Sequence, residues 1–372
     1  MARYYIGHCL LCGSENLPFG RFRNGGVVGS VSAGRWVHFL LAIARMNSNN
    51  APAMIDAFVS LNEVTEKLGT KFVYYNIHEF FDQTRNVPAG SNPTAPGKNE
   101  PNINAADETA IGEMVEDLMG GAKECDMKRE DIYPSVKTHY LINKLLEKTE
   151  CNAFTAPCFD VCATRRFNEE RFTFCLNHSL NNESAIPSSC EYDIPALLSM
   201  VMLSNMARCP AYMGNTIPNA NRLDVMDRFD EPVVAEKLKD MDNLVLTWHS
   251  VPNRKLKGYD TRTAPYSIRS FAYSGWGATI RYDFDQDEGQ TVTMCRIDPT
   301  CSKLFVARGT IVCGIGYDKQ NCTAGVFFQV EDSDDFFEKI SVVGNHNPLI
   351  YGDYFDQMVK LGKTLGFEVL TA

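Results

Sequence analysis

The sequence predicts a two-part α/β protein, with a helix-covered parallel-sheet domain over residues 1–235 and an antiparallel β-barrel domain over residues 236–372. The first observation is that helical and β-rich segments alternate between residues 34 and 160, as they do when crossover helices cover a parallel sheet. The second is that short β-rich runs separated by turn residues begin near Leu244, a pattern of antiparallel barrels or sandwiches. The third is a length of 372 residues, which exceeds one ordinary domain.

The first part divides into six predicted elements. "GRWVHFLLAIARM" (34–46) predicts a helix, and residues 51–69 predict a second helix that ends at Gly69. "TKFVYYNI" is a predicted strand because of its β-rich composition. Two further helices over 107–125 and 135–151 and a strand over 152–160 complete this part.

The second part is predicted from three β-rich runs and a closing segment. The runs are "TVTMCRID", "KLFVARGTIVCGI" and "AGVFFQVED". The segment from Gly344 to Val369 then predicts strand, helix and strand. Between the two middle helices of the first part, residues 84–107 are rich in Pro, Gly and Asn, which is typical of a disordered excursion or of a lid or subunit-contact loop.

Composition limits the class of protein. Hydrophobic residues make up 44% and charged residues 22%, so the chain can bury a core. A net charge of −10 argues against a nucleic-acid partner, and the lack of an apolar run of about 18 residues argues against a membrane partner. Without a secretory signal, we expect a cytoplasmic protein whose 13 cysteines are mostly packed thiols. This includes Cys9 and Cys12, which no second CxxC pair completes as a zinc site.

Four residues are candidates for chemistry from their local setting. Asp193 precedes an apolar helix as a cap, and Glu191 lies just before it at a strand-to-helix corner, where α/β sheets bind ligands. The alternative is that Asp193 is only a helix cap and Glu191 only a solvated charge. His249 follows an apolar strand and His346 lies in a turn, and each is either structural or catalytic.

Several motifs occur together in a fixed order. "CEYD" precedes a Leu/Met-rich helix, and Met213-Gly214-Asn215 follows about twenty residues later. "LTWHSVP", "APYSIRSFAYSGWGATI", "TVTMCRIDPTCSKLFVARGTIV" and the closing segment then follow. In this order the chain resembles the L-fucose and L-arabinose isomerase superfamily over its central and C-terminal domains. The resemblance covers roughly residues 50–372, is strongest from 188 onward, and fits a short, divergent member without the family's separate first domain.

The resemblance implies a set of site residues. Glu191, Asn215 and His346 match the positions that bind one divalent cation, for which Mn²⁺ is favoured and Mg²⁺ is possible. Asn215 stands where the family has a second carboxylate, so we expect weaker metal binding and one acid fewer. Glu191, with His249 and Asp193, is implied as the catalytic set. Arg269 and Asn215 are implied as substrate contacts.

The function that the resemblance implies is metal-dependent aldose–ketose isomerisation of a monosaccharide through an enediol. The metal polarises the oxygens while a carboxylate carries the proton. Lyase or hydrolase chemistry on a sugar, or a carbohydrate-binding relative without turnover, remains an alternative. A homo-oligomer, trimeric or hexameric, is implied as well.

Overall fold

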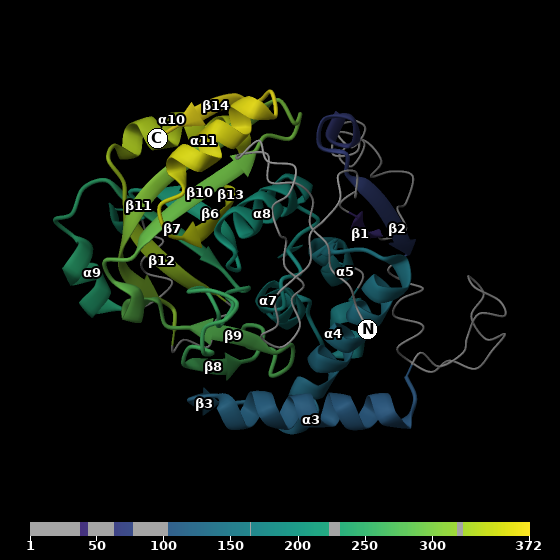
Figure 1. Ribbon diagram of the computed structural model, residues 1–372. Helices are drawn as coiled ribbons and strands as arrows, with labels where there is room; N and C mark the ends of the chain where they lie inside the picture. Colours follow the sequence, from purple (N-terminus) through teal and green to yellow (C-terminus); the bar gives the residue numbers. More distant parts are fainter. Residues whose placement is uncertain (1–37, 44–62, 77–102, 164, 223–230, 318–322) are drawn as a thin grey trace.

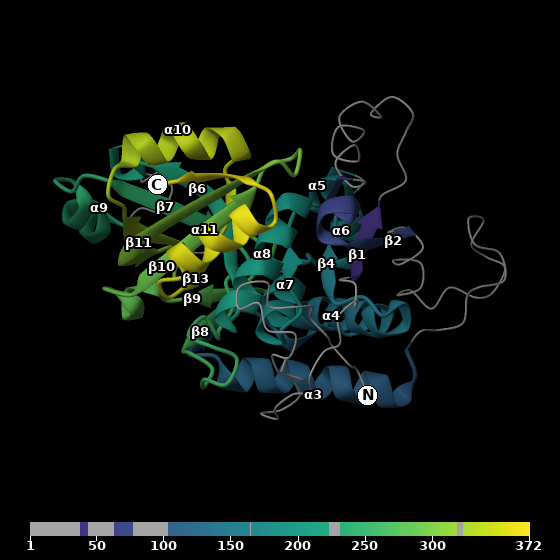
Figure 2. The same ribbon diagram turned by 45° about the horizontal axis from the view of Figure 1, so that its top comes forward.

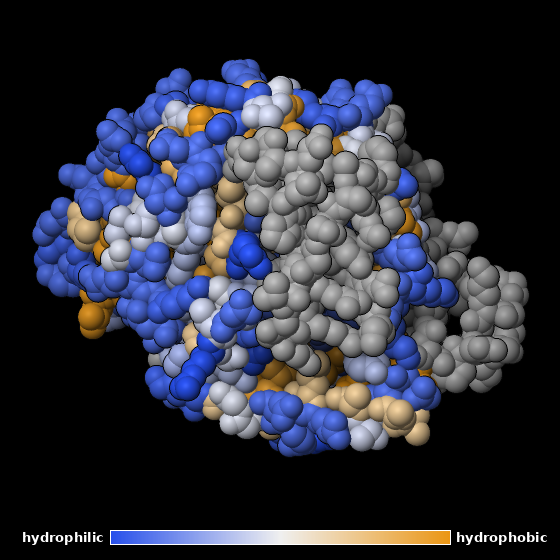
Figure 3. Space-filling view, in the orientation of Figure 1, coloured by the Kyte–Doolittle hydropathy of each residue, from blue (hydrophilic) through white to orange (hydrophobic). Residues whose placement is uncertain are grey.

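The computed structural model describes residues 38–43, 63–76, 103–163, 165–222, 231–317 and 323–372 (Figure 1). They form a mixed α/β molecule that contains a closed antiparallel β-barrel, as predicted for the C-terminal part. Among the residues that the structure describes, no helix combines the length and the apolar character needed to cross a membrane. On the face drawn in Figure 3, hydrophilic residues cover most of the coloured surface.

The barrel is closed by six strands in the order β10-β13-β6-β7-β12-β11, with β11 returning to pair with β10. Every one of these pairings is antiparallel. The strands are β6 (Tyr212–Pro218), β7 (Leu244–His249), β10 (Thr291–Ile297), β11 (Lys303–Ile315), β12 (Ala324–Gln329) and β13 (His346–Tyr351).

Alternation of side chains along the strands separates two apolar clusters. On β10, Val292 and Met294 belong to one cluster while Cys295 and Ile297 belong to another. Strand β11 repeats the pattern, because successive side chains of a strand point to opposite faces. The second cluster also contains residues of α8 (Ile194–Ala207) and α11 (Phe355–Thr364), so these helices cover one side of the barrel.

The closing strand–helix–strand is confirmed. It consists of β13, α11 and β14 (Glu368–Thr371), and β14 pairs in parallel with the first residues of β11. The helix α10 (Ser333–Val343) precedes it, and α9 (Pro232–Leu238) precedes β7. Short 3-10 turns lie at Ala220–Arg222 and Phe284–Asp287.

The parallel sheet of the first part is small. It has the order β2-β1-β4-β5, and its pairings are parallel. Helices α7 and α8 contact it. Its strands are β1 (His38–Ile43), β2 (Lys71–Asn76), β4 (Ala153–Thr155) and β5 (Ser188–Ser189).

The helix predicted over residues 34–46 is wrong where the structure describes it. Residues 38–43 form β1, which lies between β2 and β4. A short continuous apolar run is also the pattern of an inner parallel strand, so its periodicity cannot separate strand from helix. The helix predicted before β2 is described only from Glu63 to Leu68, and it ends at Gly69, whose φ is +67°.

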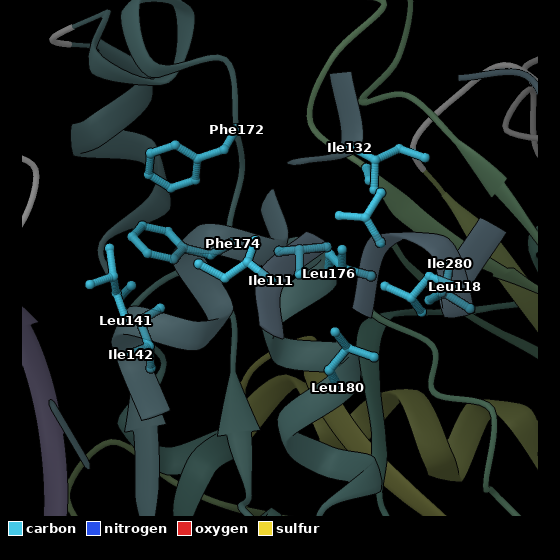
Figure 4. Packing of buried hydrophobic residues seen from close by; sticks show 14 of the residues in the cluster. Ile111, Leu118, Ile132, Leu141, Ile142, Phe172, Phe174, Leu176, Leu180 and Ile280 are labelled. Atoms are coloured by element: carbon cyan, nitrogen blue, oxygen red, sulfur yellow. The ribbon is translucent and has the colours of Figure 1, made fainter. Parts of the chain in front are cut away.

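Helices below the small sheet form a separate core (Figure 4). Helix α3 (Ala105–Gly121) is capped by Asn104, whose side chain accepts hydrogen bonds from the amides of Ala106 and Asp107. Most of the predicted 84–107 loop lies outside the described residues. The remaining helices are α4 (Arg129–Thr149), α5 (Cys158–Ala163), α6 (Arg166–Glu170) and α7 (Cys175–Glu183).

The two parts share elements across the predicted boundary at residue 235. Strand β6 lies before that boundary and pairs within the barrel. Strands β8 (Tyr266–Arg269) and β9 (Thr279–Tyr282) lie after it, yet β8 pairs with β3 (Glu124–Cys125) and both pack on α3, α4 and α7. Figures 1 and 2 both show α7 and α8 between the barrel and the small sheet.

A buried ion pair ties α7 to the segment that follows β7. The guanidinium of Arg254 donates to Glu183 through Nε at 2.8 Å and Nη2 at 2.7 Å, and the Arg254 amide donates to the same carboxylate at 2.8 Å. Glu183→Gln should therefore lower the free energy of unfolding by about 3–5 kcal/mol, because it leaves a buried guanidinium without its counter-charge. Urea denaturation followed by fluorescence measures this loss.

The matched control is Glu236→Gln. Glu236 pairs with Lys239 on the surface, where both side chains are more than half exposed. Exposed pairs contribute about 0–1 kcal/mol, so this variant should unfold close to wild type. Equal denaturation midpoints for the two variants would show that the Glu183–Arg254 pair does not join the two parts.

Candidate functional site

The corner between β5 and α8 carries two of the predicted site residues in an unusual backbone conformation. Glu191 and Tyr192 have φ values of +62° and +61°, the left-handed region that non-glycine residues rarely adopt. Such residues cost about 1–3 kcal/mol each and cluster at functional sites. Asp193 follows them and caps α8 as predicted, with its Oδ1 accepting from the Ala196 amide at 2.8 Å.

Asp193 also binds two residues of the barrel. Its Oδ2 accepts from Arg296 Nη1 at 2.9 Å and lies 3.1 Å from Nδ1 of His346. Arg296 additionally donates from Nε to the Val343 carbonyl at 2.7 Å and from Nη1 to the His346 carbonyl. The carboxylate therefore holds the start of α8 against β10 and β13 and orients the imidazole of His346.

His249 joins the same group from the end of β7. Its Nε2 lies 3.3 Å from Oε1 of Glu191, and the ring centroids of His249 and His346 are 4.8 Å apart. Both histidines are buried, whereas a quarter of the Glu191 side chain is exposed. The structure thus brings residues 191, 193, 249 and 346 together from three segments distant in sequence.

Asn215 completes the set from β6. It lies opposite His346 in the β6–β13 pairing and opposite Trp248 in the β6–β7 pairing. Its Oδ1 accepts from Asn345 Nδ2 at 3.4 Å. A pocket of about 340 Å³ opens here, and its wall includes the residues Glu191, Tyr192, Asp193, Asn215, Arg296, Asn345 and His346.

Burial and hydrogen bonds have opposite effects on the pKa values of these groups. Burial lowers the pKa of His249, against the hydrogen bond with Glu191, so the ring is neutral near pH 7. Burial alone would raise the pKa of Glu191, but the hydrogen bond with His249 prevails and lowers it. Burial likewise opposes ionisation of Asp193, yet the Arg296 charge and the His346 hydrogen bond hold its pKa far below the ordinary value.

Donor atoms at and directly beside the pocket could hold a metal ion. Cys190, Glu191 and His249 each present a ligand atom, and these atoms lie within 4.8 Å of one another. The Nε2 of His346 is buried and has no hydrogen-bond partner among the residues described, and the same is true of Nδ1 of His249. A carboxylate that fixes one nitrogen of an imidazole, as Asp193 does for His346, leaves the other nitrogen available as a metal ligand.

Arg269 lies elsewhere. It is on β8, where Nη2 donates to Glu124 at 2.6 Å and Nε lies 3.3 Å from Asp126. Its side chain is 4% exposed and is not among the residues that line the pocket. This geometry assigns Arg269 to the attachment of β8 to the segment after α3.

Sequence reasoning did not identify Arg296 or Cys190 as site residues. Arg296 alternates with apolar residues in a β-rich run, so nothing in the local pattern separates it from an ordinary edge arginine. Its role depends on the pairing of β10 with β13, which sequence periodicity does not predict. Cys190 did carry a signal, because it directly precedes Glu191 in the "CEYD" motif.

Comparison with known proteins places the chain in no family. No protein-family profile matches it. No curated protein matches it either.

The contacts of Arg296 predict a large effect of its removal. Arg296→Met should lower the free energy of unfolding by about 3–5 kcal/mol, because Asp193 would stay buried without its counter-charge. Arg296→Lys should recover only part of this loss, since an ammonium cannot reproduce the guanidinium contacts to two carbonyls and a carboxylate. Urea denaturation measures both variants.

Arg308→Met is the control for the loss of an arginine. Arg308 and its partner Asp353 are each about half exposed. This variant should stay within about 1 kcal/mol of wild type. If Arg296→Met lowered the free energy of unfolding as little as Arg308→Met, the contact with Arg296 would not be what stabilises the buried Asp193 carboxylate.

Proposed function

We propose that this protein is a metal-dependent sugar isomerase-like enzyme that interconverts an aldose and a ketose. The observation that supports it most is that Glu191 and His346 line one pocket, with His249 in contact with Glu191 and its ring 4.8 Å from that of His346. These residues come from the α8 corner, the end of β7 and the start of β13, in the order in which the fucose and arabinose isomerases carry their site residues. The closed barrel is also the C-terminal architecture that this resemblance implies.

The residues that would hold the metal are Glu191, Asn215 and His346. Carboxylate, amide oxygen and imidazole suit Mn²⁺, and Mg²⁺ is the alternative. When bound, such a cation supplies Lewis-acid polarisation of the substrate oxygens. Asn215 contributes no charge, so the site has one negative charge fewer than a site with two carboxylates.

Glu191 is the proton carrier in this proposal. Its lowered pKa makes it a carboxylate near pH 7, and a quarter of its side chain is exposed at the pocket. It would accept the proton from the carbon next to the sugar carbonyl while the carbonyl oxygen takes up a proton, which gives an enediol. It would then return the proton to the former carbonyl carbon while the other enediol oxygen loses its proton and becomes the new carbonyl. His249 would donate a hydrogen bond to Glu191 or to a sugar oxygen.

Asp193 is better suited to positioning than to proton transfer. Both of its oxygens are already occupied, by the Ala196 amide on one side and by Arg296 and His346 on the other. A pocket of about 340 Å³ is near the lower end of the usual ligand-pocket range and fits a small polar molecule such as a monosaccharide. The proposal includes a cytoplasmic homo-oligomer, trimeric or hexameric, as the resemblance implies.

Metal binding is predicted to depend on His346 and to respond to Asn215. His346→Ala should weaken Mn²⁺ binding by at least about tenfold, since loss even of an outer-shell partner typically costs about 10–100-fold. Asn215→Asp should tighten it, because the new carboxylate adds an anionic ligand. The electron paramagnetic resonance signal of free Mn²⁺ measures both affinities without an activity assay.

The control is His139→Gln. His139 is also buried, but it lies on α4 and contacts Asn177 rather than the pocket. Mn²⁺ affinity should not change in this variant. Equal binding by wild type and His346→Ala would refute the metal site, and unchanged binding by a folded Asn215→Asp would remove Asn215 from it.

Turnover is predicted to need the Glu191 carboxylate. General acid–base groups contribute about 10²–10⁴-fold in rate, so Glu191→Gln should reduce isomerisation by at least that order. The assay follows isomer formation and deuterium uptake at C2 in D₂O with Mn²⁺ present, over a panel of pentoses and hexoses. Glu236→Gln, which changes an exposed carboxylate on α9 away from the pocket, is the control and should keep wild-type rates.

The other outcomes separate the alternatives. Sugar binding without exchange or isomer formation would indicate a carbohydrate-binding relative, which the neutral Asn215 favours over two-acid chemistry. Release of a cleaved fragment would indicate lyase or hydrolase chemistry. Full activity of Glu191→Gln would remove Glu191 from the proton transfer.

A further inference from the structure

A second group of metal-ligand atoms includes Cys190, the residue that directly precedes Glu191. Cys158 at the start of α5, His178 within α7 and Cys190 after β5 each present a ligand atom, and the three atoms lie within 4.8 Å of one another. The two Sγ atoms are 3.3 Å apart, well beyond the covalent disulfide distance of about 2.0 Å. They are therefore two thiols in contact.

His178 is the observation that points to a ligand. Its side chain is completely buried, and its Nδ1 lies 2.7 Å from the Ser188 hydroxyl. Its Nε2 has no hydrogen-bond partner within the described part of the chain. A buried polar atom without a partner is costly, and an imidazole fixed through Nδ1 is oriented as metal-binding histidines are.

We propose that Cys158, His178 and Cys190 form a Zn²⁺ site, distinct from the divalent-cation site at Glu191 and His346. Two sulfurs and one imidazole nitrogen are the ligand types that select zinc, whereas Mn²⁺ and Mg²⁺ prefer oxygen. The inference does not rest on the proposed sugar chemistry, whose metal ligands are Glu191, Asn215 and His346, although the Cys190 sulfur also lies within 4.8 Å of ligand atoms of Glu191 and His249.

The charge of this site suits its surroundings. Cys190 lies in an apolar cluster with Cys175, Ala196, Met200 and Met213, and the Met213 sulfur accepts a hydrogen bond from the Cys190 amide at 3.3 Å. Two thiolates and a divalent cation sum to zero charge, which a buried site tolerates better than a lone thiolate. The contact with Cys158 and burial raise the pKa of the Cys190 thiol.

Zinc binds cysteine as the thiolate and histidine as the neutral imidazole, and this fixes the proton balance of the binding step. Zn²⁺ replaces the two thiol protons with two S–Zn bonds and takes the lone pair of neutral His178, whose pKa burial lowers to about 3. Two protons are released to solvent for each ion bound, and no oxidant or reductant is needed. Cys158 is only partly buried, which gives the ion a side from which to enter.

The test uses the full-length, reduced protein after treatment with a chelator. Co²⁺ replaces Zn²⁺ in such sites and produces an intense thiolate-to-cobalt charge-transfer band in the near ultraviolet. Wild type should show this band for one Co²⁺, and Zn²⁺ should abolish it with release of two protons. Cys158→Ser should lose most of the band, with circular dichroism showing that the variant is folded.

The controls are matched by position. Cys162→Ser changes an exposed thiol one turn further along the same helix and should keep the band. The double variant Cys9→Ser/Cys12→Ser removes the sequence's CxxC pair and should keep it as well. Glu191→Gln and His346→Ala should keep the cobalt band even where they lose Mn²⁺, which separates failure of this inference from failure of the proposed function.

Three results would overturn the zinc site. The band could persist unchanged in folded Cys158→Ser, or it could disappear in the Cys9→Ser/Cys12→Ser variant. The chelated and reduced wild type could also show no band, while the untreated protein is lighter by two hydrogens and yields a Cys158–Cys190 disulfide peptide. The last result would make the pair a disulfide rather than a metal site.

Discussion

The carboxylate of Asp193 is the contact on which the arrangement of the site depends. One of its oxygens caps α8, and the other binds Arg296 of β10 and His346 of β13. Because α8 is apolar on several sides, it packs both on the barrel and on the small sheet, and its start must be held in one place relative to both. A neutral residue at position 193 would leave Arg296 as a buried unpaired charge. The same carboxylate therefore caps α8 and balances the charge of the site.

The strained corner before α8 follows from this constraint. The chain leaves β5, places Glu191 at the pocket and then has to present Asp193 to the barrel, all within four residues. Two consecutive left-handed residues make that turn, at a cost of about 1–3 kcal/mol each. The charged hydrogen bonds of Asp193, typically about 1.5–3 kcal/mol each, are of the size needed to offset it.

Sequence patterns predicted the features that depend on local chemistry. The Asp193 cap, the end of the helix at Gly69, the closing strand–helix–strand and the antiparallel barrel all follow from neighbouring residues. The strand β1 was predicted as a helix because its short apolar run lacks the polar–apolar alternation that marks a half-exposed strand. The roles of Arg296 and of the Cys158–Cys190 thiol pair could not be predicted. They depend on the pairing of β10 with β13 and on the contact of α5 with the segment after β5, which are distant in sequence.

Cys190 and Glu191 are adjacent in sequence, yet they belong to two different chemical surroundings. Cys190 lies among sulfurs and apolar side chains, and Glu191 lies at a polar pocket beside two imidazoles. The thiols of Cys158 and Cys190 suit a soft cation and the Glu191 carboxylate suits a harder one, and the Cys190 sulfur lies within 4.8 Å of ligand atoms in both groups. An ion held by Cys190 would fix the backbone that carries Glu191, and the strained corner would then be held from both sides: by Asp193 through the barrel and by Cys190 through α5 and α7.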